Sequence, residues 1–201
     1  VPLFGIDTRL PGLVHAALVK CPAHGGTVAS IDDVAVKAIP GVIAVVAVNS
    51  GFVPLGKNDT VLIVADSWWK ASKARAKLAV TWDDSAVTGF STAGYEKAAA
   101  GLADSAPQVS LFKAGDADAA LGSAAKVVKA DYEYPFLAHA TLEPQNCTAW
   151  FKDGVMEMWT PTQIPATGQG LVSKGLGIAA KDVTVHITRL GGGFGRRGSN
   201  E

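Results

Sequence analysis

The sequence has few cysteines and no pattern that would hold a metal cluster. Cys21 and Cys147 are the two cysteines among 201 residues, and no C-x-x-C pair occurs. An iron–sulfur cluster or a structural zinc site needs about four ligands at short spacings, so this chain alone offers neither. The two thiols could form one disulfide, but we expect both to be free and packed in the core.

The sequence also lacks an excess of charge and a long apolar run. Lysine and arginine number 18, as do aspartate and glutamate, so the formal net charge is zero. We therefore expect no nucleic-acid partner and no electrostatic binding to a membrane surface. No run approaches the roughly 20 apolar residues of a membrane-spanning helix. Residues 1–12 lack the features of a signal peptide, and without an initial methionine we expect a processed or excised chain.

The apolar content is sufficient for a sizeable core, because 48% of the residues are hydrophobic and 18% are charged. The apolar patterns predict a mixed α+β fold. In the first 84 residues we expect strands at 13–19, 42–48, 61–65 and 78–83, and helices at 30–38 and 67–79. The run at 42–48 is uninterrupted, which indicates a buried strand. Ser30 is the expected N-cap of the helix at 30–38.

The remaining sequence predicts a connector and a second structured part. Residues 85–124 are rich in small and polar residues and include one helix-like stretch, TAGYEKAAAGLA. After the connector we expect a strand at 126–134, a hairpin at 146–160 that turns at residues 152–154, a helix at 162–177 after Pro165, and a strand at 182–190.

A glycine run, RLGGGFGRRG at 189–198, follows the last expected strand. Residues 193–198 match G-x-G-x-x-G, but a dinucleotide-binding fold also needs a following helix and a later acidic residue, and the sequence ends at Glu201. A simple turn needs fewer glycines. Consecutive bare backbone N–H groups suit an oxyanion, a phosphate or a metal-bound oxygen, and Arg196 and Arg197 add donors for phosphate.

Three stretches occur in an order and spacing that resemble one enzyme family. They are HATLEPQN (139–146), EMWTPTQIP (157–165) and VTVHITRLGGGFGRR (183–197). Together they closely resemble the molybdenum-binding large subunit of the xanthine dehydrogenase and aldehyde oxidase family. The most similar branch is that of the isoquinoline 1-oxidoreductase beta subunits and their aldehyde-oxidising relatives, in which a double arginine replaces the Gly-Lys of xanthine dehydrogenases. The first 84 residues are similar to the family's α/β hammerhead domain.

The resemblance implies a molybdenum hydroxylase that oxidises an aldehyde or an N-heteroaromatic ring, with water as the oxygen source. Its cofactor is molybdenum–molybdopterin cytosine dinucleotide. In the family, a glutamine that matches Gln163 hydrogen-bonds the apical molybdenum oxygen, and amides of the glycine run approach the molybdenum ligands and the pterin phosphate region. The cofactor-binding residues implied here are Gln163, Gly192, Gly193, Phe194, Gly195, Arg196 and Arg197. None is a direct metal ligand, and we expect Arg197 to support the loop or a phosphate.

The resemblance also implies that part of the site lies outside this sequence. The family's catalytic glutamate lies far beyond the glycine run, and Glu201 is not at the matching place, so we expect no catalytic residue here. We expect a hammerhead-like domain at 1–84, a connector at 85–124 and an incomplete cofactor-binding domain at 125–201. The separate chain should be inactive and purify without molybdenum, either as a fragment or as one component of a split subunit.

His139 and Glu143 are four residues apart, a spacing that on a helix suits metal binding or acid–base chemistry. Pro135 and Pro144 argue against a regular helix here. In the family that the sequence resembles, this stretch is a structural turn beside the cofactor domain, and the resemblance therefore implies a structural role.

The partners that the resemblance implies are the remainder of the large subunit, a small 2Fe–2S subunit and, beyond it, a cytochrome c. The compartment implied is the bacterial periplasm or cytoplasm. Two other functions stay open. One is a non-catalytic module that docks the iron–sulfur subunit. The other is a nicotinamide- or flavin-binding protein that uses the glycine pattern.

Overall fold

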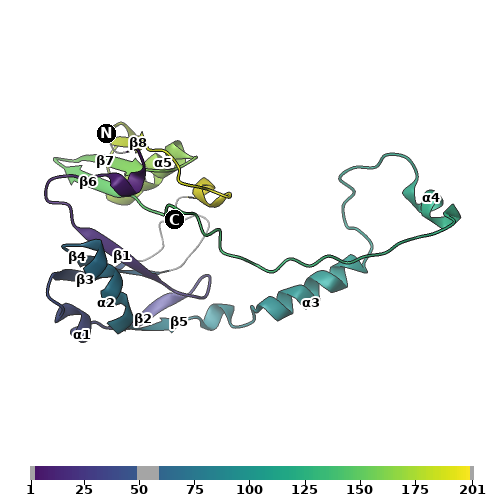
Figure 1. Cartoon of the computed structure of the whole chain (residues 1–201), viewed down its shortest axis with the longest axis horizontal. Helices are drawn as coiled ribbons and strands as arrows, with labels where there is room; N and C mark the ends of the chain where they lie inside the picture. The colour runs from purple at the N-terminus through teal and green to yellow at the C-terminus, as the bar shows by residue number, and fades with distance from the viewer. Residues whose placement is uncertain (1–2, 49–58, 200–201) are drawn as a thin grey trace. The chain divides into compact units, whose positions relative to one another are not determined.

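The computed structural model describes residues 3–48 and 59–199. The chain divides into two compact units, Val1–Thr88 together with His139–Glu201, and Gly89–Ala138. Figure 1 labels the elements. The strands are β1 (His15–Lys20), β2 (Thr27–Asp32), β3 (Val42–Val48), β4 (Thr60–Ala65), β5 (Ala79–Asp83), β6 (Thr148–Lys152), β7 (Val155–Thr160) and β8 (Val183–Ile187). The helices are α1 (Val34–Lys37), α2 (Trp68–Ala74), α3 (Thr92–Ala103), α4 (Ala117–Ser123) and α5 (Pro165–Leu176).

The first sheet has the strand order β1–β4–β3, and both pairings are antiparallel. β4 lies in the middle, and its alternate side chains Val61, Ile63 and Ala65 are fully buried. Helix α2 packs on this sheet through Ala71 and Ala74, whose small side chains allow a close approach. The strand expected at 61–65 is therefore confirmed, and the helix expected at 67–79 is confirmed in its first part, because α2 ends at Ala74 and Ala79 already lies in β5.

Two expectations for the first 84 residues are wrong. The run at 42–48 is an edge strand whose last three residues are exposed, rather than a buried strand. Residues 30–38 do not form one helix, because Ser30 lies in β2 and the helical turn α1 follows Asp33. β2 pairs with β5, and that long-range pairing outweighs the local N-cap signal at Ser30.

The third sheet, after the two-stranded sheet of β2 and β5, has the order β6–β7–β8, with β6 antiparallel and β8 parallel to β7. The expected hairpin is confirmed, and it turns at Asp153 and Gly154, which both have positive φ. Helix α5 connects β7 to β8 and covers a buried cluster of Met156, Met158 and Val183. This strand–helix–strand crossover places two segments at the same sheet edge, namely the segment that follows β7 and the segment that follows β8.

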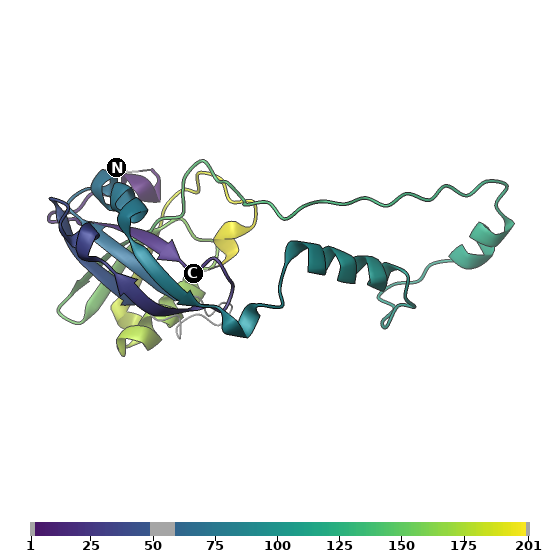
Figure 2. The same ribbon diagram turned by 90° about the horizontal axis from the view of Figure 1, so that it is seen from below.

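The second unit, Gly89–Ala138, contains α3 and α4 joined and followed by chain without regular structure. Figure 2 shows this unit with its long extended segment. The helix expected at TAGYEKAAAGLA is confirmed as α3, but the strand expected at 126–134 is wrong. Leu111 and Phe112 are 95% and 85% exposed. The unit therefore buries little of its apolar surface.

Cys21 is buried and Cys147 is exposed, and both are free thiols. The expectation of a core position is therefore confirmed for Cys21 and wrong for Cys147. Among the described residues, no helix combines the length and the apolar character needed to cross a membrane. Within the same residues, no group of three or more His, Cys, Asp or Glu side chains is arranged to hold a metal ion. The mixed α+β fold class expected from the sequence is confirmed.

Candidate functional site

The glycine run follows β8 and ends in a short 3-10 turn at Arg196–Gly198. The backbone N–H of Arg189 donates to the carbonyl oxygen of Leu3 at 3.0 Å, which fixes the start of the run. The backbone N–H of Gln163 donates to the carbonyl oxygen of Arg197 at 3.0 Å, which fixes its end. The fold thus brings the run beside Gln163, which lies in the segment between β7 and α5.

The glycines of the run have different physical causes. A Cβ on Gly191 would overlap the Cβ of Glu143, so the protein's own side chain requires a glycine there. Gly192 and Gly195 have φ of 99° and 89°, a conformation that favours glycine. Gly193 has neither cause, because its φ is not positive and a Cβ would lie 4.0 Å from the nearest atom. A Cβ at Gly193 would therefore fit without overlap, in ordinary van der Waals contact with Leu190.

Phe194 lies in the middle of the run with φ of 49°, and its side chain is 77% exposed. Positive φ is uncommon for a residue with a side chain and is strained for a bulky one. An apolar ring in this conformation contributes little to the core. The loop therefore presents Phe194 outward at a cost in backbone strain.

The run also carries a row of unpaired backbone donors. In the part of the chain that the structure describes, the N–H groups of Gly192, Gly193, Phe194 and Gly195 have no hydrogen-bond acceptor. The next N–H, of Arg196, donates to the carbonyl oxygen of Gly193 at 2.8 Å. Successive unpaired N–H groups in a turn form an electropositive concavity that suits an anion or a polarised oxygen.

Gln163 follows two buried residues, Pro161 and Thr162, but is itself exposed. Its side-chain amide has no hydrogen-bond partner among the described residues. Its Oε1 lies 3.9 Å from the position that a Cβ would take on Gly198. The side chain is therefore close to the end of the glycine run and free to donate to or accept from a bound group.

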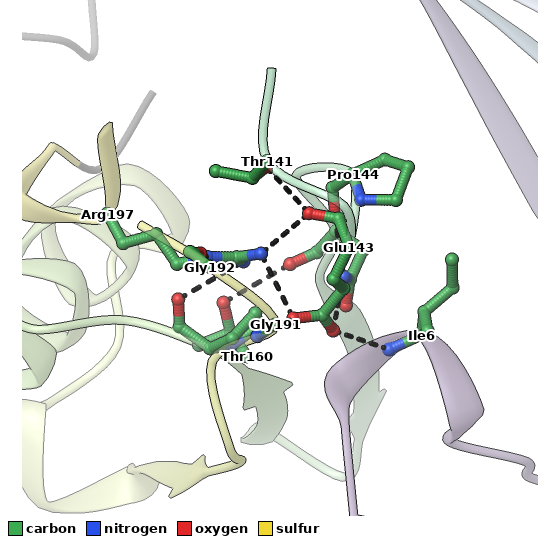
Figure 3. Close-up of polar contacts among 10 residues, drawn as sticks. Ile6, Thr141, Glu143, Pro144, Thr160, Gly191, Gly192 and Arg197 are labelled. Carbon is green, nitrogen blue, oxygen red and sulfur yellow. Dashed lines mark hydrogen bonds and ion pairs between the residues drawn. The ribbon is translucent and has the colours of Figure 1, made fainter. Parts of the chain in front are cut away.

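Arg197 points into the interior of the protein and is 1% exposed (Figure 3). Its Nε donates to the carbonyl oxygen of Gly192 at 2.7 Å. Its Nη2 donates to the carbonyl oxygen of Glu143 at 2.7 Å and to Glu143 Oε2 at 3.0 Å. From the sequence we expected Arg197 to support either the loop or a phosphate. These hydrogen bonds to Gly192 and Glu143 are those of a residue that supports the loop. Arg196, the other arginine of the pair, is half-buried.

Glu143 is the other member of this buried ion pair. Its Oε2 accepts the Gly191 N–H at 2.9 Å, and its Oε1 accepts the Ile6 N–H at 3.2 Å and Asn146 Nδ2 at 2.9 Å. Residues 139–146 form an irregular turn, as expected, and no helix brings His139 onto Glu143. The pairing of Glu143 with Arg197 is not predictable from the sequence, because no short-range spacing links residues that lie 54 positions apart.

The surroundings of Glu143 determine its charge. Burial alone would raise the pKa of the carboxyl. The N–H of Gly191, the side-chain amide of Asn146, the N–H of Ile6 and the charge of Arg197 together outweigh burial, and they lower the pKa from its ordinary value of 4.5. Glu143 is therefore ionised at neutral pH and fully engaged. It serves as a structural anion rather than as an acid or base.

Comparison with known proteins places this geometry in context. Residues 102–201 match the family model of the molybdopterin cofactor-binding domain. The chain is 28% identical over 197 residues to the membrane-bound aldehyde dehydrogenase (pyrroloquinoline-quinone) of Gluconacetobacter polyoxogenes. It is 27% identical over 205 residues to isoquinoline 1-oxidoreductase subunit beta of Brevundimonas diminuta. These matches cover 97% and 96% of this chain and 25% of each relative, so the chain spans about a quarter of their length.

Solved structures show the same fold. Quinoline 2-oxidoreductase from Pseudomonas putida 86 aligns with a TM-score of 0.60 at 19% identity, over 96% of this chain and 29% of that chain. Carbon monoxide dehydrogenase from Oligotropha carboxidovorans aligns with a TM-score of 0.59 at 20% identity, over 96% and 29%. At these identities the likeness establishes the mixed helix and sheet fold.

Proposed function

Because the chain belongs to the xanthine dehydrogenase and aldehyde oxidase family of molybdopterin-binding subunits, we propose that residues 191–195 and Gln163 bind part of a molybdenum–molybdopterin cofactor. When bound, this group supplies the two-electron oxidation of an aldehyde or an N-heteroaromatic carbon. The role of the chain is to bind and orient the group. The base that completes the reaction is supplied from outside residues 1–201.

The observation that carries the proposal is the row of unpaired N–H groups at residues 192–195. Such donors suit the phosphate and the polarised oxygens of the cofactor. Gly193 supports the same conclusion, because neither packing nor φ requires a glycine there and a Cβ would fit without overlap, 4.0 Å from the nearest atom. The residues present therefore fit a group that approaches the backbone from solvent.

Gln163 and Arg196 are the side chains that we assign to the same group. The Gln163 carboxamide is exposed and unpaired, so its NH2 can donate to an oxygen of the cofactor. Arg196 contributes a positive charge next to the run, which favours the phosphates of a dinucleotide form. We propose the cytosine dinucleotide, and we assign Arg197 to the interior of the loop rather than to a phosphate.

A quinone is the second candidate cofactor, because one relative is named for pyrroloquinoline quinone. The carboxylates of that quinone would also accept N–H groups of the glycine run. The match of residues 102–201 to a molybdopterin-binding domain favours the pterin. Both candidates predict an anion at the run, so the chemical identity of the bound group has to be measured.

The partners that we propose are the remainder of a large subunit, a small 2Fe–2S subunit and a cytochrome c, in a bacterial periplasm or cytoplasm. One observation favours a second function for this chain, which is docking of the iron–sulfur subunit. Leu111 and Phe112 are almost fully exposed in a unit with little apolar burial, and exposed apolar stretches of this kind are typical of interaction surfaces. A pull-down with the purified iron–sulfur subunit tests the docking function.

The cofactor proposal is tested on the polypeptide encoded by the natural gene, expressed in a bacterium that makes molybdopterin. We expect about one molybdenum and one pterin per protein, measured by metal analysis and by fluorescence of the oxidised pterin. The separately expressed 201-residue chain should contain neither. Chromatography for pyrroloquinoline quinone is the parallel measurement, and a stoichiometric quinone without pterin would overturn the proposal. Titration with NAD and FAD should show no binding.

A further inference from the structure

Glu143 and Arg197 are buried charges that the proposed function does not use. They are 7% and 1% exposed, and Arg197 Nη2 lies 3.0 Å from Glu143 Oε2. Isolated buried charges are unfavourable, so their pairing and hydrogen bonding are needed to keep both in the interior. We call this ion pair the Glu143–Arg197 clamp.

The clamp reaches the glycine run at two peptide groups. Glu143 holds Gly191 at both polar atoms, because Glu143 Oε2 accepts the Gly191 N–H and the Glu143 N–H donates to the Gly191 carbonyl at 3.0 Å. Arg197 Nε holds the Gly192 carbonyl at 2.7 Å. Figure 3 shows the guanidinium between Gly192 and Glu143. The first two carbonyls of the run are thus tied to protein donors.

A third carbonyl is held in the same way, since Gly193 accepts the Arg196 N–H at 2.8 Å. In a trans peptide the C=O and the following N–H point in opposite directions, and no described peptide bond is cis. Binding of the carbonyls of Gly191, Gly192 and Gly193 therefore directs the N–H groups of Gly192, Gly193 and Phe194 away from these donors. These are three of the four N–H groups of residues 192–195, none of which has an acceptor among the described residues.

We infer that Glu143 and Arg197 are positioning residues that fix the direction of the Gly193 N–H toward the bound group. The inference rests on the proposed function of the run. The Gly191–Gly192 and Gly193–Phe194 peptides are held by backbone N–H donors, those of Glu143 and Arg196. The Gly192–Gly193 peptide between them is held by the Arg197 side chain. Glycines impose little barrier to rotation of this peptide. Without Arg197 it can turn its carbonyl outward, where an anion would be repelled.

The first test measures the order of individual amides by ¹⁵N relaxation of the full 201-residue chain. Arg197→Lys keeps the charge but loses the Nε donor, and Glu143→Gln/Arg197→Met removes both charges without changing the net charge. In both variants we expect the order parameter of Gly193 to fall from about 0.85 to below about 0.6. Gly192 and Phe194 should change far less, and amides of β4 and β7 report whether the fold is intact.

The second test is titration with inorganic pyrophosphate, followed at the amide signals of residues 192–195. Glu143→Gln makes the site more positive, so simple electrostatics predicts tighter binding, whereas a lost clamp predicts binding weaker by about tenfold or 1.4 kcal/mol. The charge-neutral double variant should weaken binding by a similar factor. Arg189→Met is the control for loss of one positive charge, because Arg189 is exposed and is the first residue of the run, outside residues 192–195. We expect it to change the affinity by about twofold or less.

The outcomes separate the two proposals. Unchanged order at Gly193 in a folded Arg197→Lys chain overturns the positioning role, and so does an equal loss of order throughout the first unit. If pyrophosphate shifts no amide signal of the run in the wild-type chain, the proposed cofactor role loses its support. The positioning role of the clamp is still supported in that case if the order parameter of Gly193 falls in Arg197→Lys. If pyrophosphate binds equally to wild type and the double variant, the cofactor role stands and the clamp fails.

Discussion

The backbone N–H of Gln163 donates to the carbonyl oxygen of Arg197 at 3.0 Å, so the segment after β7 and the end of the glycine run are joined through the main chain. The Gln163 side chain takes no part in this contact and is exposed. The effect of Gln163 on the stability of the fold can therefore be measured separately from its effect on cofactor binding. A change of the side chain leaves the join intact and removes only the carboxamide.

We expect Gln163→Ala to leave the free energy of unfolding within about 0.5 kcal/mol of wild type, because the side chain is exposed and unpaired. The same change should lower the pterin retained by the natural gene product by about tenfold, since one hydrogen bond to the cofactor is lost. Urea unfolding measures the first effect and fluorescence of the oxidised pterin the second.

Gln169→Ala is the matched control. Gln169 Nε2 donates to the carbonyl oxygens of Ala180 and Val183 at 2.9 and 2.8 Å, and so ties α5 to the start of β8. Its loss should cost about 1–3 kcal/mol of stability and leave pterin per folded molecule unchanged. Equal pterin loss in both variants would contradict a specific role for Gln163.

Acid should weaken the fold through Glu143. Its pKa in the folded chain lies below 4.5, so the pairing stabilises the fold above about pH 4.5, and this stabilisation is lost as the pH falls through the folded pKa. Wild type should exceed Glu143→Gln in stability at neutral pH, and the difference should shrink below about pH 4.5. Urea unfolding across this range measures the difference.

A pH-independent difference between wild type and Glu143→Gln would contradict the assigned ionisation. The control for this measurement is Glu96→Gln, because Glu96 is exposed on α3 and outside the clamp. We expect Glu96→Gln to leave the free energy of unfolding at neutral pH within about 0.5 kcal/mol of wild type.

Removal of Arg197 alone should cost more than removal of the whole clamp. Arg197→Met leaves the Glu143 carboxylate buried without its cation, for which about 3–5 kcal/mol is typical. In Glu143→Gln/Arg197→Met no charge remains in the interior, so the loss should be smaller by at least about 1 kcal/mol. A double-mutant cycle by urea unfolding measures both values. Additive losses would show that the two side chains do not stabilise the fold as a pair.

Local sequence signals correctly predicted the elements that local chemistry determines. Asp153 and Gly154 mark a hairpin because both adopt positive φ, and TAGYEKAAAGLA forms a helix capped by Ser91. Ser30 misled, because a capping residue is also acceptable in a strand that finds a partner. Residues 126–134 alternate as a strand would, but no partner strand for them occurs among the described residues, and alternation alone supplies no backbone hydrogen bonds.

Part of the candidate site was also predictable from the sequence. The glycine run and Gln163 are visible in the sequence, and the fold brings them together. The inward direction of Arg197 was not predictable from the sequence, because adjacent arginines look alike and the partner Glu143 is 54 positions away. The sequence also could not show why residue 191 is a glycine, because the atom that a side chain there would overlap belongs to Glu143.

Gly191 and Gly193 should respond in opposite ways to alanine. Gly191→Ala places a methyl group against the Cβ of Glu143, which is too close to its own backbone to move aside, so we expect a loss of about 1–3 kcal/mol. In Gly193→Ala the methyl group would lie 4.0 Å from the nearest atom, at a φ that is not positive, so stability should be unchanged or rise by up to about 1 kcal/mol through a less flexible unfolded chain. Urea unfolding measures both.

Gly191→Ala and Gly193→Ala also separate effects on stability from effects on anion binding. Gly193→Ala should weaken pyrophosphate binding at the run by about tenfold while the fold stays intact, because the methyl group occupies the space through which an anion reaches the N–H groups of residues 192–194. Unchanged pyrophosphate affinity in this variant would mean that a ligand does not approach the run from that side. A stable Gly191→Ala chain would mean that Glu143 does not hold the run as closely as its contacts indicate.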